Sequence, residues 1–277
     1  MPGLCAIVLC ETPSVRVRDV RCSADRGRHR GAEEYDEVPT VVIPYRGTFV
    51  RRIGTRHHHA DPNQVLFFNA GEAYRVDHPI DGGDGCLSLQ FTPQWLEDLL
   101  AHRVAFRNGS PVFPQTHQLA TPAVQLMACR LRHQSAADPM LTEVLSATML
   151  TSLFDTAPDR TSLSASARRL VDEARTLLQQ DPARRWSLSE LAAQLGTSPV
   201  YLTQIFSAAE GLPLYRYQTR LRLARALASL ADTEDLAALA LDHGFASHSQ
   251  FTAAFLRTYG VTPSMFRKRI LRERRLT

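Results

Sequence analysis

The first third of the chain alternates short hydrophobic runs with turn-forming residues. The runs are rich in β-branched and aromatic side chains, which favour strands. They are Val38–Tyr45, Gly47–Val50, Val65–Phe68 and Cys86–Phe91. Glycine, proline, asparagine and aspartate separate them, as in residues 61–63 and 81–85. Many short strands with this punctuation predict a small antiparallel sandwich or barrel over about residues 14–92.

The hydrophobic spacing becomes helical after Thr92-Pro93. A short helix is predicted at residues 95–100, and apolar side chains recur every three or four residues in 123–133 and 140–154. We therefore expect helices over about residues 93–156 that either cover the β-domain or pair with a second subunit. The pattern favours neither arrangement.

A polar segment without periodicity follows, from Thr156 to Ser164, and it contains Pro158. Such a segment predicts a linker, and the spacing beyond it is helical again. The chain is therefore predicted to be an α+β multidomain protein. The expected parts are a β-containing domain with a helical extension at 1–156, a linker at 157–166 and an all-α C-terminal domain at 167–277.

The charge is divided unevenly between these parts. Residues 1–160 contain 16 basic and 18 acidic residues, whereas residues 161–277 contain 16 basic and 10 acidic residues, so their net charges are −2 and +6. A positive charge confined to one domain is expected if that domain alone binds a polyanion. A solvated basic face would give the same pattern.

No segment predicts a membrane span or a secretion signal. The most apolar N-terminal run, Leu4–Leu9, is far below the ~18 residues of a spanning helix and has no basic segment before it. The five cysteines have irregular spacing and form no C-x-x-C pair, so no disulfide framework or zinc ribbon is indicated. We expect a soluble cytoplasmic protein that does not contact a membrane.

One sequence pattern occurs twice in the C-terminal domain, at Ser187–Phe206 and Glu234–Phe255. The matching positions are Leu191-Ala192 with Leu239-Ala240, Gly196 with Gly244, Ser198 with Ser247, Leu202 with Phe251, and Phe206 with Phe255. The predicted helix ends are the capping boxes Ser187–Glu190 and Ser247–Gln250, the N-cap Ser198 followed by Pro199, and the helix-ending Gly196 and Gly244. Each copy is therefore predicted to be a helix-turn-helix.

The segment between the two copies predicts a rigid helix with one apolar stripe. From Leu214 to Leu230 it would span roughly 25 Å at about 1.5 Å per residue. That length could hold the two units near one DNA turn apart, about 34 Å along the axis.

The C-terminal domain resembles that of the AraC/XylS family of bacterial transcription regulators. The resemblance is carried by Arg220–Leu227, Gly244–Phe251 and Tyr259–Arg267, and it covers about residues 170–270. It implies a sequence-specific protein that places two helices of one chain in successive major-groove segments of double-stranded DNA. It also implies an activator that contacts RNA polymerase, with no enzyme activity and no cofactor.

The resemblance assigns base contacts to the second helix of each unit. The candidates are Val200, Thr203, Gln204 and Ser207 in the first unit, and His248, Ser249, Gln250 and Ala253 in the second. Gln204 can bond bidentately to adenine, and Val200 can contact a thymine methyl group. Ala253 stands where a long polar side chain is often found in the family. We therefore expect the second unit to contribute less to base recognition than the first.

Candidate phosphate contacts are hydroxyl and basic side chains near the same helices. They are Ser198, Tyr201, Arg220, Thr252, Arg267, Lys268 and Arg269, with Arg272, Arg274 and Arg275 close by. Any one arginine could instead be an ordinary surface cation. Together they predict an affinity for DNA that falls with salt.

Residues 62–68 and 71–79 resemble the cupin-like domain that precedes this DNA-binding domain in many family members. In the family such domains bind a small effector, form homodimers, or both. The inward-facing candidates for contact with an anionic or phenolic effector are Arg46, Arg51, Tyr74 and His78.

A metal-dependent cupin enzyme is one alternative. Residue types that bind metals occur at Cys22, His29, His57, His58, His59, Glu72 and His78. Successive strand residues point to opposite faces, so at most His57 and His59 of the histidine run could share a site. No glutamate follows them at the spacing of a metal cupin. We therefore expect no metal and no catalytic residue.

A DNA-alkylation repair protein with a cysteine-zinc domain is a second alternative. Cys5, Cys10 and Cys22 suggest it, but no fourth cysteine follows at a suitable spacing.

Overall fold

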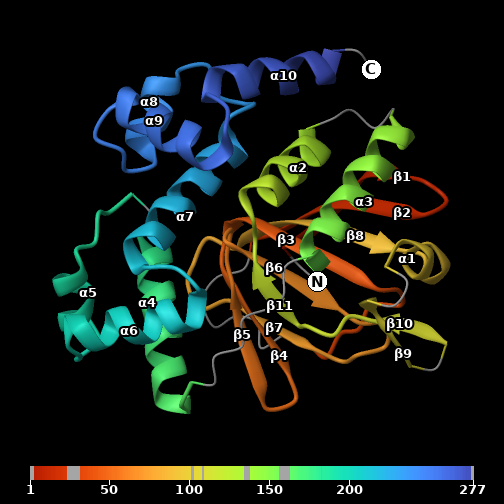
Figure 1. Ribbon diagram of the computed structural model, residues 1–277, viewed down its shortest axis with the longest axis horizontal. Coiled ribbons are helices and arrows are strands. Elements are labelled where there is room, and N and C mark those ends of the chain that lie inside the picture. The colour runs from red at the N-terminus through yellow and green to blue at the C-terminus, as the bar shows by residue number, and fades with distance from the viewer. Residues whose placement is uncertain are drawn as a thin grey trace.

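The computed structural model describes residues 3–23, 32–100, 103–107, 109–133, 138–155, 163–181 and 183–275. A β-domain lies beside a helical C-terminal domain and contacts it directly (Figure 1). Most of the predicted linker (residues 156–162), His29 and the side chain of Arg275 lie outside the described residues.

The β-domain is built from antiparallel strands. The larger sheet has the order β1-β2-β8-β3-β6-β11, and a smaller sheet has the order β5-β4-β7. The strands are β1 (Leu4–Glu11), β2 (Val15–Cys22), β3 (Thr40–Gly47), β4 (Phe49–Ile53), β5 (Arg56–Ala60), β6 (Gln64–Phe68), β7 (Arg75–Asp77), β8 (Asp84–Phe91), β9 (Ala105–Arg107), β10 (Ser110–Val112) and β11 (His117–Leu119). The predicted antiparallel β-domain is confirmed.

Two features of this domain differ from the prediction. The run at Leu4–Leu9 belongs to a strand, β1, which pairs with β2 at the edge of the larger sheet. Residues 105–119 contain β9, β10 and β11 rather than helix, and β11 extends the larger sheet beside β6. These strands have only three residues each, too short for periodicity to identify them.

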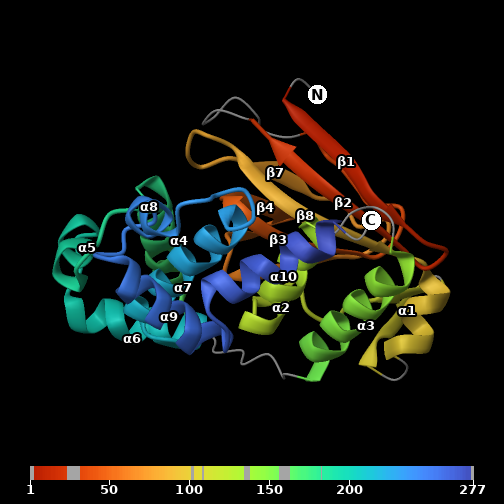
Figure 2. The same ribbon diagram turned by 90° about the horizontal axis from the view of Figure 1, so that it is seen from above.

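Each face of the larger sheet packs against a different layer, because strand side chains alternate in direction. Val17 and Leu89 face the helices α1 (Pro93–Leu100), α2 (Pro122–His133) and α3 (Pro139–Asp155) in one core. Cys86 and Leu66 face the smaller sheet in another. Figure 2 shows α1, α2 and α3 along the sheet. In this structure the middle helices therefore cover the β-domain.

The C-terminal domain is entirely helical where it is described. Its helices are α4 (Ala165–Gln180), α5 (Leu188–Gln194), α6 (Pro199–Glu210), α7 (Leu214–Ser229), α8 (Leu236–Asp242), α9 (His248–Tyr259) and α10 (Pro263–Arg275). Two cores share α7. One joins it to α4, α5 and α6, and the other joins it to α8, α9 and α10. Cys129 of α2 packs in the second core, so the β-domain extension contributes to it.

A buried polar network joins the two domains. Arg175 of α4 contacts Asp61 of the β-domain (Nε–Oδ2 3.1 Å) and Glu210 at the end of α6 (Nη1–Oε1 3.4 Å). Tyr217 of α7 donates its hydroxyl hydrogen to Asp61 Oδ2 at 2.6 Å, and Gln64 donates to Glu210 at 2.8 Å. Burial raises the pKa of the Glu210 carboxyl, and the nearby Arg175 opposes that effect. The network therefore fixes where the domains meet.

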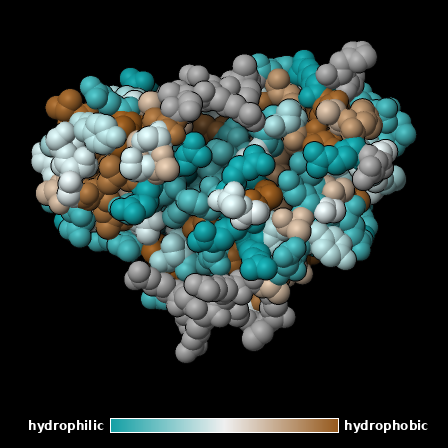
Figure 3. Space-filling model, turned by 90° about the horizontal axis from the view of Figure 1, so that it is seen from below, coloured by the Kyte–Doolittle hydropathy of each residue, from teal (hydrophilic) through white to brown (hydrophobic). Residues whose placement is uncertain are grey.

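Seen from below, the middle of the molecule, where the domains adjoin, is largely hydrophilic (Figure 3). The β4–β5 hairpin contacts α4 at the domain boundary through His59. His59 is half-buried, its Nδ1 lies 3.5 Å from Thr176 Oγ1, and its main-chain oxygen accepts a hydrogen bond from Arg175.

The Asp61→Ala variant should lose about 3–5 kcal/mol of unfolding free energy, because it leaves Arg175 buried with only one of its two carboxylate partners. Urea unfolding followed by the two tryptophans, Trp95 in α1 and Trp186 before α5, measures the loss. The exposed pair of Glu11 and Arg16 offers a control, since Glu11→Ala should leave the midpoint unchanged. Equal losses of unfolding free energy in both variants would contradict the proposed contribution of the network to stability.

Acid should weaken the same interface. Burial, with a contribution from Arg175, lowers the pKa of His59 to about 3, so His59 is neutral in the folded chain near pH 6. The unfolded chain takes up this proton near pH 6.5, so the unfolding free energy falls as the pH drops from 6.5 towards 3, by up to about 1.4 kcal/mol per unit. Urea unfolding at several pH values should show a shallower slope for His59→Gln. An unchanged slope would contradict this role.

Candidate nucleic-acid interface

The first helix-turn-helix has the predicted helix ends. Ser187 Oγ accepts a hydrogen bond from the Glu190 main-chain N–H, and the Glu190 carboxylate accepts one from the Ser187 N–H at 2.8 Å. Gly196, after α5, has φ 63°, a left-handed conformation that favours glycine. Ser198 caps α6, with Pro199 in its first turn. The local sequence thus determines both helix boundaries and the turn.

The second unit follows the same plan with one difference. Gly244 has φ 75°, and Ser247 caps α9 by accepting from the Gln250 N–H at 3.1 Å. Gln250 Oε1, however, accepts from the main-chain N–H of Ala246 rather than from that of Ser247. The predicted Ser247–Gln250 box is therefore only half formed.

The second helix of each unit has one buried face and one exposed face. Leu202 and Phe206 of α6, like Phe251 and Phe255 of α9, are fully buried, as the repeat predicted. On the opposite side of α6, Val200 is 68% exposed. The other first-unit candidates share this side, with Gln204 exposed and Thr203 and Ser207 half-buried. The face assigned to base contacts is therefore open to solvent.

The candidates of α9 are exposed as well, but some of their polar groups already have partners. His248, Ser249, Gln250 and Ala253 are all exposed. Gln250 Oε1 accepts from two N–H groups, and His248 Nε2 lies 3.4 Å from Thr252 Oγ1. Thr203 of α6 is engaged in the same way, since its hydroxyl donates to the main-chain oxygen of Pro199 at 2.9 Å. The expected asymmetry between the units stays a prediction.

The two units touch each other directly as well as through α7. Arg185, in the segment between α4 and α5, donates to the main-chain oxygen of Gly244 at 2.8 Å and to Gln250 Oε1 at 3.0 Å. A Cβ atom on Gly244 would lie 2.2 Å from the main-chain oxygen of Ala183, so only glycine permits this approach. Sequence reasoning missed Arg185, although it lies two residues before the capping residue Ser187.

The helix α7 is more buried than a single apolar stripe predicts. Besides Leu221 and Ala224, its arginines Arg222 and Arg225 are buried, because the helix packs between both units and the β-domain. Arg222 donates to the main-chain oxygen of Arg184. The guanidinium groups of Arg222 and Arg225 are therefore directed into the protein, whereas Arg216 of the same helix is exposed.

The phosphate candidates divide into exposed and engaged side chains. Ser198, Tyr201, Lys268 and Arg269 are exposed, and Thr252 and Arg267 are half-buried. Arg267 donates to the main-chain oxygen of Glu234 at 3.0 Å, and Arg269 pairs with Glu273.

Arg220 does not fit its predicted role in this arrangement. It is half-buried and donates to the main-chain oxygen of Ala120 in the β-domain, and burial lowers its pKa. The guanidinium is directed at the domain interface and not at the exposed faces of α6 and α9.

The four effector candidates do not form one site. Arg51 is fully buried, donates to the main-chain oxygens of Phe67 and Thr116, and lies 4.3 Å from the centre of the Phe68 ring. Burial lowers its pKa to about 10. Tyr74 packs against the same Phe68 ring, and its hydroxyl lies 3.3 Å from Asp36. Arg51 is therefore a structural cation that connects strands.

The other two candidates lie elsewhere. His78 is buried and bonded to Asp84 (Nε2–Oδ1 2.6 Å). Arg46 is exposed and lines a cleft of about 800 Å³ between the two domains. Arg132 of α2, Arg225 of α7 and His243 after α8 line the same cleft.

His57 and His59 do lie on one side of β5, near Asp172 of α4. The cysteines of the repair hypothesis are not gathered in the described residues: Cys5 is exposed, Cys10 is buried, and Cys22 groups with His78 and Asp84. None of the helices in the described ranges is long and apolar enough to cross a membrane.

Comparison with known proteins identifies the family to which the two domains belong. A profile of the AraC-binding-like domain matches residues 8–156, and a profile of a helix-turn-helix domain matches residues 191–269. A protein described as an AraC-like transcription regulator in Streptomyces antibioticus is 34% identical over 145 residues, which cover 50% of this chain and 48% of that protein. The chain thus spans about half the length of such curated relatives.

Two solved structures are also similar. The AraC-type transcriptional regulator from Chromobacterium violaceum is 25% identical over 39% of this chain and 96% of that chain, with a TM-score of 0.36. ToxT from Vibrio cholerae is 13% identical over 94% of this chain and 98% of that chain, with a TM-score of 0.40. The family assignment depends on the sequence profiles, since both TM-scores are below 0.5.

The expected asymmetry between the units predicts different effects of two substitutions. Gln204→Ala should reduce discrimination at one adenine of the DNA site by about tenfold, because a bidentate contact contributes about 1–3 kcal/mol. His248→Ala should have a smaller effect. Fluorescence anisotropy with single-base variants of the bound site measures both. Lys268→Ala is the control and should weaken all sequences alike. Equal loss of discrimination in Gln204→Ala and His248→Ala would show that the units contribute equally.

Proposed function

This chain belongs to the AraC family of DNA-binding transcription regulators, and from that premise we propose that it activates transcription in the cytoplasm in response to a small effector. The observation that carries the proposal is the pair of exposed faces on α6 and α9, held in one domain by α7 and by Arg185. One chain supplies both units, and each enters a successive major-groove segment. Both matched domains belong to a family of regulators rather than enzymes.

The effector is proposed to bind in the cleft between the domains. Arg46 comes from the β-domain, and Arg225 comes from the C-terminal domain. Arg225 Nη1 is buried without a hydrogen-bond partner among the described residues. A buried guanidinium with an unused donor favours an anionic group, because charge-assisted hydrogen bonds are strong. Since both domains form the walls, binding there would change the free energy of their arrangement.

RNA polymerase is the proposed protein partner, on the surface that remains exposed when α6 and α9 contact DNA. Homodimerisation stays a prediction. The exposed residues Met140 and Val144 of α3 would be available for it, because the buried side of α3 covers the β-domain.

Selection of random DNA with the full-length protein tests the DNA-binding proposal. The expected winner has two short sequence blocks about one helical turn apart, bound at least 10³-fold better than scrambled DNA. Its affinity should fall steeply with salt, with a log–log slope of about −0.9 for each phosphate contacted. A variant with Val200→Glu and Ala253→Glu serves as the control and should lose binding, since both positions are exposed. Weak and equal binding to every sequence would contradict the proposal.

A further inference from the structure

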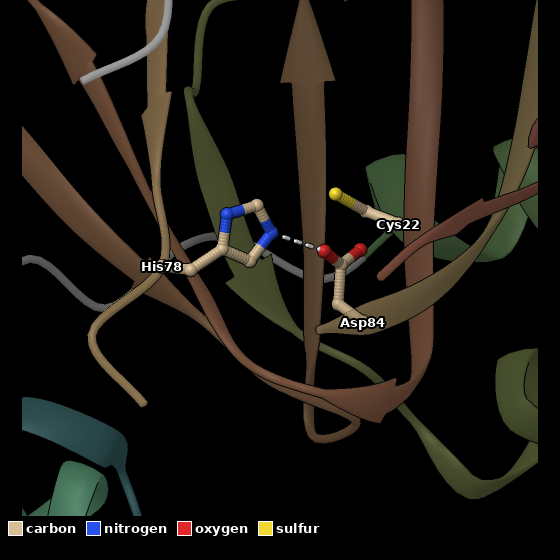
Figure 4. A group of neighbouring side chains, drawn as sticks. All are labelled: Cys22, His78 and Asp84. Atoms are coloured by element: carbon tan, nitrogen blue, oxygen red, sulfur yellow. Dashed lines mark hydrogen bonds and ion pairs between the residues drawn. The ribbon is translucent and has the colours of Figure 1, made fainter. Parts of the chain in front are cut away.

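Three metal-binding side chains converge at one end of the β-domain. Cys22 ends β2, His78 follows β7, and Asp84 begins β8. One ligand atom from each, Sγ, an imidazole nitrogen and a carboxylate oxygen, lies within 4.8 Å of the other two. Figure 4 shows His78 and Cys22 directed towards the Asp84 carboxylate from different segments.

The fold brings these residues together through sheet register and two glycines. Cys22 lies directly opposite Asp84 in the β2–β8 ladder, so both side chains point to the same face. The turn before β8 approaches closely: a Cβ atom on Gly83 would lie 1.9 Å from the main-chain oxygen of Cys22, and one on Gly47 would lie 2.1 Å from that of Gly83. Only glycine permits these approaches, so this arrangement is built into the sequence.

The surroundings make this cluster unusual for a domain interior. His78 and Asp84 are buried, and the adjoining core contains Phe49, Leu66 and Phe68. A second thiol, Cys86 on the same strand as Asp84, donates to Asp84 Oδ2 at 3.1 Å. Burying an ionisable group costs free energy unless it is paired or binds a metal. The Asp84 carboxylate is thus surrounded by an imidazole and two thiols, which are residue types that bind metal ions.

We propose that Cys22, His78 and Asp84 bind one zinc ion, with Cys86 beside them as the source of a fourth ligand. Sulfur, nitrogen and carboxylate oxygen are the ligands that Zn²⁺ takes in tetrahedral protein sites. Ligand atoms in such a site lie about 3.3–3.8 Å apart, as bond lengths of about 2.0–2.3 Å require. The 2.6 Å His78–Asp84 contact would have to lengthen, and any distance in the group between 3.8 and 4.8 Å would have to shorten. The Cys86 Sγ lies 3.1 Å from Asp84 Oδ2 but outside this group of three, so the Cys86 side chain would have to turn towards the ion.

The site would have a structural role with a link to regulation. It joins the end of β2 to the turn at residues 80–83, and that turn lines the cleft between the domains. Zinc would hold this wall of the cleft in place. A zinc ion here would contradict the predicted absence of a metal, because that prediction depended mainly on the spacing of the histidines in β5.

That run supplies a matched control. His57, His59 and Asp172 form a second group of metal-ligand types, but His57 is exposed and no thiol is present. Cys5 is an exposed cysteine on β1, outside both groups. Substitutions at these positions change the same residue types without touching the proposed site.

Metal analysis of the full-length protein tests the proposal. After growth with added zinc and gel filtration, the expected content is about one zinc per chain. Cys22→Ser and Asp84→Asn should each lose at least four fifths of it, whereas Cys5→Ser and His57→Gln should retain it. Replacement of zinc by Co²⁺ should give a thiolate-to-cobalt charge-transfer band in the wild-type protein. Cys22→Ser should weaken this band, and Cys5→Ser should not.

The outcomes separate the possibilities even if a variant fails to fold. If the wild-type protein holds no zinc after purification and takes up none when zinc is added, this result alone overturns the proposal. Zinc retained in folded Cys22→Ser and Asp84→Asn, or lost in His57→Gln, assigns the ion to another site and also overturns it. The absence of a charge-transfer band in cobalt-loaded wild-type protein excludes thiolate ligation.

Discussion

The buried guanidinium of Arg175 is the interaction on which the arrangement of the two domains depends. It lies between Asp61 of the β-domain and Glu210 of the C-terminal domain, and it also donates to the main-chain oxygen of His59. An arginine removed from water needs partners for its donors, because an unpaired buried cation costs several kcal/mol. Apolar contacts tolerate small displacements, but directed hydrogen bonds do not. The domains therefore meet in one geometry at this point.

Both helix-turn-helix units are connected to the β-domain in this geometry. The first is connected through Glu210, the last residue of α6. The second is connected through α9, where the Tyr259 hydroxyl donates to Gln125 Oε1 of α2 at 3.0 Å. Since α2 also packs on the larger sheet, a change in the β-domain reaches α9 through a single helix. The position of each unit thus depends on contacts with the β-domain, which forms one wall of the proposed effector cleft.

The sequence predicted local features well and long-range ones poorly. The caps at Ser187 and Ser198 and the left-handed Gly244 depend on residues within one helical turn, so their patterns are sufficient. Arg175 and Asp61 are 114 positions apart, and nothing local distinguishes Arg175 from a surface arginine. The same holds for Arg220, which was assigned to DNA from its position on α7 and contacts the β-domain instead.

The predicted base-contact positions fall between these two cases. Gln204 and Val200 follow from the repeat, because the buried Leu202 and Phe206 fix which side of α6 is exposed. The hydrogen bond from Arg185 to Gln250 crosses between the units, and periodicity within one unit does not reveal it. Strand β1 was missed for a related reason. Its apolar residues Ile7 and Val8 are about half exposed at the sheet edge, so they show no alternation between core and solvent.

The helix α6 connects the domain interface directly to the face that is proposed to contact DNA. Its N-terminal half presents Val200 and Gln204 to solvent, and its last residue, Glu210, lies in the network around Arg175. Twelve helical residues span roughly 18 Å and move as one body, so a displacement at Glu210 also moves Gln204. A ligand in the cleft would favour the relative orientation of the domains for which it has the higher affinity. The ratio of its affinities for two such orientations would set the size of the effect on DNA binding. Coupling by this proposed route would require a shift of one rigid helix and no chain of intermediate residues.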